Sequence, residues 1–139
     1  MILLDTSGIL SALFPDQYRH KDCARILLES DPPLILSPFV LAETDYLIHK
    51  YGGVATEALF LEDVARGAYE LPDFRAADVD QARQLVTKYA SLRIGLTDAS
   101  IAVLAARYET LDLLTLDERH FRAIRPMPRK NFRILPADA

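Results

Sequence analysis

Residues 95–121 read GLTDASIAVLAARYETLDLLTLDERHF, and this stretch decides the fold class. Residues 99–106 are mostly apolar on every side, which predicts a buried helix over 97–107 that begins beside Thr97 and Asp98. The run LDLLTL at 111–116 predicts a strand of the buried, parallel kind, and Asp117 follows it directly. Ligands of open α/β sheets bind beyond the carboxyl ends of the strands, so acids at these positions indicate a polar site there.

The rest of the chain alternates strands and helices in the same way. Strands are predicted at 2–4, 34–37 and 132–135, with a further short one at 69–71. Helices are predicted over 8–14, 18–29, 38–51, 55–66 and 75–89, and a short one from Glu118, with Gly52 and Gly53 separating the third from the fourth. This alternation predicts one α/β domain over residues 1–139 with a mainly parallel central sheet.

Composition narrows the class of protein. The chain has 139 residues, of which 50% are hydrophobic and 26% charged, and this fits a single globular domain. No apolar run approaches the roughly 20 residues that cross a bilayer. The start, MILLDTS, lacks a basic leader, and Cys23 is the single cysteine. We therefore expect a cytoplasmic protein without a membrane segment or a disulfide.

Charge is unevenly distributed along the chain. The net charge of −4 argues against a non-specific nucleic-acid coat protein. Residues 119–133 nevertheless contain no acid and six basic side chains, which are Arg119, Arg122, Arg125, Arg129, Lys130 and Arg133. Two interpretations stay open: a solvated surface, or an edge that contacts phosphates.

Four acids stand where elements begin, end or pack. Asp5 follows strand 2–4, Asp98 opens the buried helix, and Asp117 follows strand 111–116. Taken singly, each of these three is also explained as a helix cap or as an acid favoured by the helix dipole. Glu43 is different, because helical spacing puts it in one apolar stripe with Phe39, Val40, Tyr46 and Leu47.

A carboxylate in an apolar stripe needs a charged partner, and the sequence offers no obvious lysine or arginine for Glu43. A divalent cation would relieve the repulsion among several carboxylates, and oxygen ligands suit Mg²⁺ or Mn²⁺. Asp45 is expected to face solvent. The histidines show no ligand spacing: His20 and His49 are interpreted as helix-packing residues, and a catalytic role for His120 is the less favoured interpretation.

Four motifs together resemble the PIN-domain nucleases, and most of all the VapC toxins of prokaryotic VapBC toxin–antitoxin modules. They are MILLDTSGILSAL, the LAE at 41–43, GLTDASIAVLA and LLTLDERHF, in this order over nearly the whole chain. The resemblance implies a three-layer α/β/α fold and Mg²⁺- or Mn²⁺-dependent endonucleolytic cleavage of RNA. It places the metal-binding and catalytic quartet on Asp5, Glu43, Asp98 and Asp117.

Further expectations follow from the resemblance. Thr6 or Ser7, and Thr115, match polar positions that support the site, and Arg119, Arg122 and Arg125 are predicted to guide RNA toward it. The resemblance also implies a homodimer and a cognate VapB-like antitoxin, for which the helices at 38–51 and 55–66 could supply an apolar surface. The RNA target stays open among transfer, ribosomal and messenger RNA.

Rival classes fit less well. A receiver-type signalling domain would need adjacent acids after the first strand and a lysine after a late strand, and the chain has neither. A haloacid-dehalogenase-like phosphatase would need a second aspartate two residues after Asp5, where Ser7 stands. A PIN-like module that binds RNA or protein without cutting it stays as the alternative, and the intact quartet disfavours it.

Overall fold

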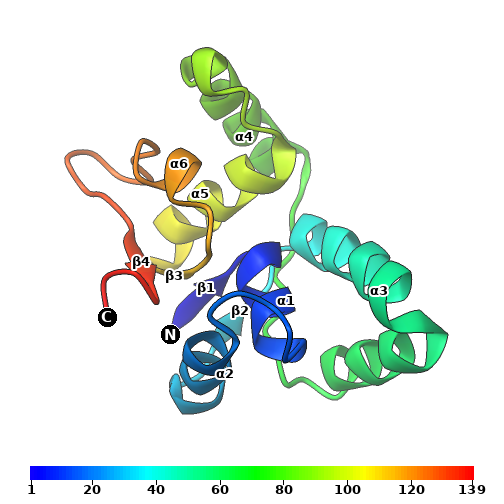
Figure 1. The fold of residues 1–139 in the computed structure, drawn as a ribbon. Coiled ribbons are helices and arrows are strands. Elements are labelled where there is room, and N and C mark those ends of the chain that lie inside the picture. The colour runs from blue at the N-terminus through cyan, green and yellow to red at the C-terminus, as the bar shows by residue number, and fades with distance from the viewer.

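A four-stranded sheet lies at the centre of the computed structural model, which describes residues 1–139 (Figure 1). The strands are β1 (Ile2–Leu4), β2 (Leu34–Ile35), β3 (Asp112–Leu114) and β4 (Arg133–Leu135). The helices are α1 (Thr6–Leu13), α2 (His20–Glu29), α3 (Pro38–Ala65), α4 (Ala76–Lys88), α5 (Leu96–Tyr108) and α6 (Glu118–Phe121), with a 3₁₀ turn at Ala90–Leu92. None of the helices combines the length and the apolarity that a bilayer crossing needs.

The sheet has the strand order β2-β1-β3-β4, and every pairing is parallel. Leu3 of β1 lies in register with Ile35 on one side and with Leu113 on the other. The predicted strand at 69–71 contributes only one parallel bridge, between Glu70 and Ile35. Because all strands run the same way, their carboxyl ends meet at one edge, where Asp5 and Asp117 follow β1 and β3.

Helices cover both faces of the sheet, with α1 and α2 on one side and α4 and α5 on the other (Figure 1). The predicted all-round burial of α5 is confirmed, since every residue from Ala99 to Ala105 is buried. On the opposite face, a Cβ atom on Gly8 of α1 would lie 2.5 Å from the carbonyl oxygen of Leu114 in β3. The absence of a side chain at Gly8 thus allows α1 to approach the sheet closely.

Helix α3 agrees with its prediction in where it divides and differs in which row of side chains it buries. Two helical arms meet at Gly53, whose φ of 79° and ψ of 178° are not helical, so the predicted separation of two helices at Gly52 and Gly53 is confirmed (Figure 1). The predicted stripe containing Glu43 is wrong, because the first arm buries Val40, Thr44 and Ile48 instead.

The cause is the way in which the first arm of α3 is anchored. The Ser37 hydroxyl caps the helix by accepting the Phe39 N–H, and it lies 2.7 Å from the Ser100 hydroxyl of α5. Thr44 donates a hydrogen bond to Thr6 of α1. These contacts turn the row at 40, 44 and 48 inward, while Glu43 is exposed and Tyr46 is 63% exposed.

Candidate metal centre

Four carboxylates from four different elements converge on one open cavity of about 260 Å³. Asp5 ends β1, Glu43 lies on the first arm of α3, Asp98 is in the first turn of α5, and Asp117 caps α6. The cavity is lined by these acids together with Thr6, Ser7, Leu10 and Leu47. The predicted quartet therefore lies together, although its members are as much as 112 residues apart (117 minus 5).

Asp5 is the most buried of the four acids, with 6% of its surface exposed. Its Oδ2 accepts hydrogen bonds from the hydroxyls of Thr115, at 2.6 Å, and Ser7, at 3.1 Å. Burial raises the pKa of Asp5 from 3.8 to about 6; the Thr115 hydrogen bond opposes this shift, and the negative charge of Asp98 adds to it. A nearby cation would stabilise the ionised form that the fold alone disfavours.

Ser7 and Thr115 also connect β1 to the loop after β3. The Thr115 hydroxyl accepts the Asp117 N–H at 3.0 Å, and the Ser7 hydroxyl accepts the Leu116 N–H at 2.9 Å. Both side chains thus occupy the supporting positions that the sequence predicted. Thr6 lines the cavity too, but its hydroxyl accepts from Thr44.

Asp98, Asp117 and His120 form a tight group beside Asp5. The Nδ1 atom of His120 lies 3.1 Å from Oδ2 of Asp98 and 3.0 Å from Oδ2 of Asp117. Burial raises the pKa of Asp98, with His120 opposing that shift and the charges of Asp117 and Glu43 adding to it. One ligand atom from each of the three residues lies within 4.8 Å of the other two, so the group could hold a metal ion.

His120 lies beside Asp98 and Asp117, and the signal in the sequence that predicts this position is local. Asp117 is the N-cap of α6, and its Oδ1 accepts the N–H of His120 three residues later. This cap brings the third residue of the first turn back beside the capping carboxylate. A histidine three residues after a predicted site aspartate at a helix start is therefore placed within reach of the site.

Glu43 reaches the cavity for a different reason from the one predicted. It lies on the solvent side of α3 rather than in an apolar stripe, so it bears little cost of burial. The expectation for Asp45 is also wrong: its Oδ1 is buried without a hydrogen-bond partner. The neighbouring carboxyl group of Glu57, on the far arm of α3, is the main cause that raises the pKa of Asp45.

Comparison with known proteins identifies the family. A family model described as PIN domain matches residues 2–125. The chain belongs to the PIN domain family. It is 41% identical over 135 residues to Ribonuclease VapC26 of Mycobacterium tuberculosis, which covers 97% of this chain and 100% of that protein.

Solved structures share the fold of this PIN domain. VapC20 of M. tuberculosis, described as a sarcin-ricin loop cleaving toxin, matches with a TM-score of 0.78 at 18% identity over 86% of this chain and 92% of its own. VapBC2 from Rickettsia felis, bound to a DNA fragment from its promoter, matches with a TM-score of 0.67 at 22% identity over 96% and 98%. A toxin–antitoxin complex from Klebsiella pneumoniae matches with a TM-score of 0.68 at 18% identity over 91% and 98%.

The three arginines predicted to guide RNA differ in their surroundings, and none lines the acidic cavity of this PIN domain. Arg122 pairs with Glu118 at 2.7 Å and with Asp138 at 2.8 Å, so its charge is already compensated. Arg119 and Arg125 are exposed and make no ion pair. Of these three arginines, only Arg119 and Arg125 have guanidinium groups that are free to meet a phosphate.

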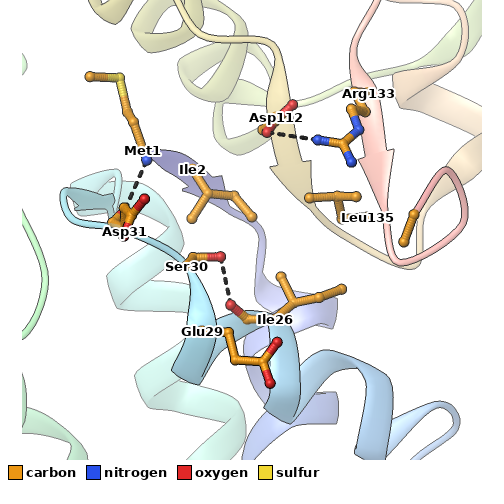
Figure 2. A pocket seen from close by; sticks show the side chains of 10 residues that line it. Met1, Ile2, Ile26, Glu29, Ser30, Asp31, Asp112, Arg133 and Leu135 are labelled. Carbon is orange, nitrogen blue, oxygen red and sulfur yellow. Dashed lines mark hydrogen bonds and ion pairs between the residues drawn. The ribbon is translucent and has the colours of Figure 1, made fainter.

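A second cavity, of about 330 Å³, lies at the other end of the sheet (Figure 2). Ile2 begins β1, Asp112 begins β3 and Arg133 begins β4, so this cavity is at the amino edge of the strands. Arg133 and Asp112 pair within it at 3.2 Å, and the Met1 ammonium donates to the Asp31 carbonyl (Figure 2). Arg133 and Asp112 thus compensate each other in this cavity, whereas no lysine or arginine lines the acidic cavity at the carboxyl edge.

The residues at the carboxyl edge of this PIN domain fit a divalent cation. Burial is the main cause that raises the pKa values of Asp5 and Asp98, the charges of neighbouring carboxylates add to it, and no lysine or arginine lines the cavity to compensate them. Carboxylate oxygens are the donors that Mg²⁺ and Mn²⁺ prefer. Asp5, Glu43, Asp98, Asp117 and His120 are the side chains that could hold such an ion.

Proposed function

We propose that this PIN domain is a metal-dependent endoribonuclease and the toxin of a VapBC-type toxin–antitoxin module. The observation that carries the proposal is the convergence of Asp5, Glu43, Asp98 and Asp117 on one cavity. The 41% identity to a ribonuclease over almost the whole chain supports the same reaction. RNA hydrolysis needs a centre that activates water and tolerates the charge of a phosphodiester, and gathered carboxylates holding Mg²⁺ or Mn²⁺ meet that need.

A bound Mg²⁺ or Mn²⁺ ion supplies an acidified water and neutralises charge on the phosphate. The protein's part is to hold the ligands in place. The hydroxyls of Ser7 and Thr115 both donate to Oδ2 of Asp5 and so fix the orientation of its carboxylate. Asp98 and Asp117 lie on the rigid first turn of α5 and the cap of α6, and exposed Glu43 completes the ring from α3.

RNA must approach a site whose own charge is negative, so cations beside the site are needed to attract the phosphates. We assign this role to Arg119 and Arg125, which are exposed and unpaired. Arg122, which the sequence analysis grouped with them, is instead held by Glu118 and Asp138 and is expected to position α6.

An antitoxin partner, a homodimer and a cytoplasmic location belong to the same proposal. The folds of the Klebsiella and Rickettsia toxin–antitoxin proteins support the antitoxin. Helix α3 carries exposed apolar side chains at both arms, at Tyr46, Tyr51, Val54, Leu59 and Leu61. These side chains offer the apolar surface that a VapB-like segment would cover.

The test is RNA cleavage by purified protein, with Mg²⁺ or Mn²⁺ and with chelator. Wild type and an Asp16→Asn control, which changes an exposed acid outside the cavity, should cut a mixed RNA pool only with metal. Asp5→Asn and Asp98→Asn should abolish cleavage. Identical products from wild type and both site variants would refute the proposal, and binding of RNA without cleavage would favour the module that only binds.

A further inference from the structure

His120 has an atom in the metal centre that no hydrogen bond explains. Its Nδ1 is fully buried, although 23% of the side chain is exposed, and it lies about equally far from Oδ2 of Asp98 and Oδ2 of Asp117. At these distances Nδ1 has no hydrogen-bond partner, and the two contacts are ion pairs only when the imidazole is protonated. The nitrogen is therefore oriented into the space that the two carboxylates share rather than at one of them.

The spacing of these atoms matches one side of a coordination shell. Around an octahedrally coordinated ion with metal–ligand bonds of about 2.1 Å, neighbouring ligand atoms lie about 3.0 Å apart. The Nδ1 atom is 3.1 Å from the Asp98 oxygen and 3.0 Å from the Asp117 oxygen. An ion that bound these two carboxylates would therefore lie within bonding reach of the imidazole as well.

The position of His120 is fixed by the helix that carries it. Its backbone N–H donates to the Asp117 cap. Arg122, which follows α6, pairs with Glu118 of α6 and with Asp138, and so ties the helix to the C-terminal segment. Phe121, the next residue, is fully buried and stacks edge-on against Phe132. The contacts of Asp117, Arg122 and Phe121 thus fix α6, and with it the position of the imidazole, as a metal ligand requires.

We propose that His120 is a ligand of this metal centre and that its nitrogen biases the centre toward first-row transition ions such as Mn²⁺ over Mg²⁺. The inference rests on the proposed function, because it concerns the same ion. Mg²⁺ favours oxygen donors, whereas imidazole strengthens binding of the transition ions. One nitrogen among the carboxylates therefore changes which ion the site selects, without changing its charge.

The test measures ion binding in the absence of RNA. Calorimetric titration of wild type with Mn²⁺ and with Mg²⁺ should show tighter binding of Mn²⁺. His120→Ala should weaken Mn²⁺ binding about tenfold or more and Mg²⁺ binding less than about threefold. Pulsed electron paramagnetic resonance of bound Mn²⁺ should detect a coordinated imidazole nitrogen in wild type and lose it in the variant.

His49→Ala serves as the matched control, because His49 is exposed on α3 and pairs with Glu57 outside the cavity. It should leave both affinities and the nitrogen signal unchanged. His120→Asn keeps a polar side chain without the imidazole and should reproduce the selective loss of Mn²⁺ binding. It therefore replaces the alanine variant if that variant fails to fold. Thermal unfolding without metal checks the fold of each variant.

Several results would overturn the inference. Equal losses for Mn²⁺ and Mg²⁺ would mean that His120 acts only by positioning the carboxylates, and tighter binding after substitution would mean that it competes with the ion. Absence of the nitrogen signal, or of Mn²⁺ binding, in wild type would also overturn it. Failure of the proposed function looks different: Mn²⁺ would bind with the nitrogen signal intact, and RNA would stay uncut.

Discussion

Asp5 is buried at the end of β1 with a carboxyl pKa of about 6, so its ionisation near neutral pH costs folding free energy. The folded state binds the Asp5 proton more tightly than the unfolded chain, where the pKa is close to 3.8. Between these values the folded state holds more protons, and the free energy of unfolding therefore falls as the pH rises from about 4 to about 6. The fall amounts to roughly 3 kcal/mol at most.

We expect Asp5→Asn to remove this pH dependence. Urea unfolding in chelator, from pH 4 to pH 7, should show the variant gaining stability relative to wild type by up to about 3 kcal/mol across that range. Asp16→Asn should show no such trend. Saturating Mn²⁺ should restore wild-type stability at pH 7, because the ion binds the ionised carboxylate of the folded state. A constant difference between variant and wild type would contradict the prediction.

At the scale of single residues, helix-start and strand-end acids were predictable because their position depends on local sequence. Asp5, Asp98 and Asp117 are of this kind. Glu43 was placed in the site by its resemblance to a motif, whereas the physical argument for its burial was wrong. The inward position of His120 depends on the cap of a four-residue helix, and the pairing of Arg122 depends on Asp138, sixteen residues away. The periodicity of apolar residues along a helix predicts neither contact.

The elements around the site depend on one close approach, between α1 and β3. We expect Gly8→Ala to destabilise the protein by about 1–3 kcal/mol, because its Cβ would lie 2.5 Å from the Leu114 carbonyl oxygen, and backbone cannot move aside cheaply. Displacing α1 should also disturb the Ser7–Asp5–Thr115 bonds and lower RNA cleavage. Urea unfolding and cleavage rates measure both effects; a loss below about 0.5 kcal/mol would show that α1 adjusts freely.

Elements with a strong internal pattern were predicted well, and elements whose orientation depends on partners were not. The apolar run of α5 and the short strands can be read from the sequence, because burial on all sides leaves no face to choose. Helix α3 has apolar residues on more than one side, so periodicity could not decide which row turns inward. Its contacts with α1 and α5, through Thr44 and Ser37, decide that.

At the scale of the whole molecule, the proposed attraction of RNA rests on Arg119 and Arg125, which are exposed and make no ion pair. In an Asp98→Asn background that binds RNA without cutting it, Arg119→Gln and Arg125→Gln should each weaken RNA affinity. Each should also reduce the slope of log affinity against log salt by about 0.7, the value for one phosphate contact on a single strand. Arg122→Gln should leave the slope unchanged, since its charge is compensated by Glu118 and Asp138. Equal effects of all three would contradict this division.

The wide separation of the four acids along the chain has a consequence for synthesis on the ribosome. A nascent chain that stops before residue 117 contains Asp5, Glu43 and Asp98 but lacks the acid that completes the cavity. Even then, β3 gains its outer neighbour only when residues 133–135 have emerged, and Asp138 must follow before Arg122 can hold α6. Nascent fragments of this PIN domain therefore lack a complete acidic cavity, and the site can first form when almost the entire domain has been translated.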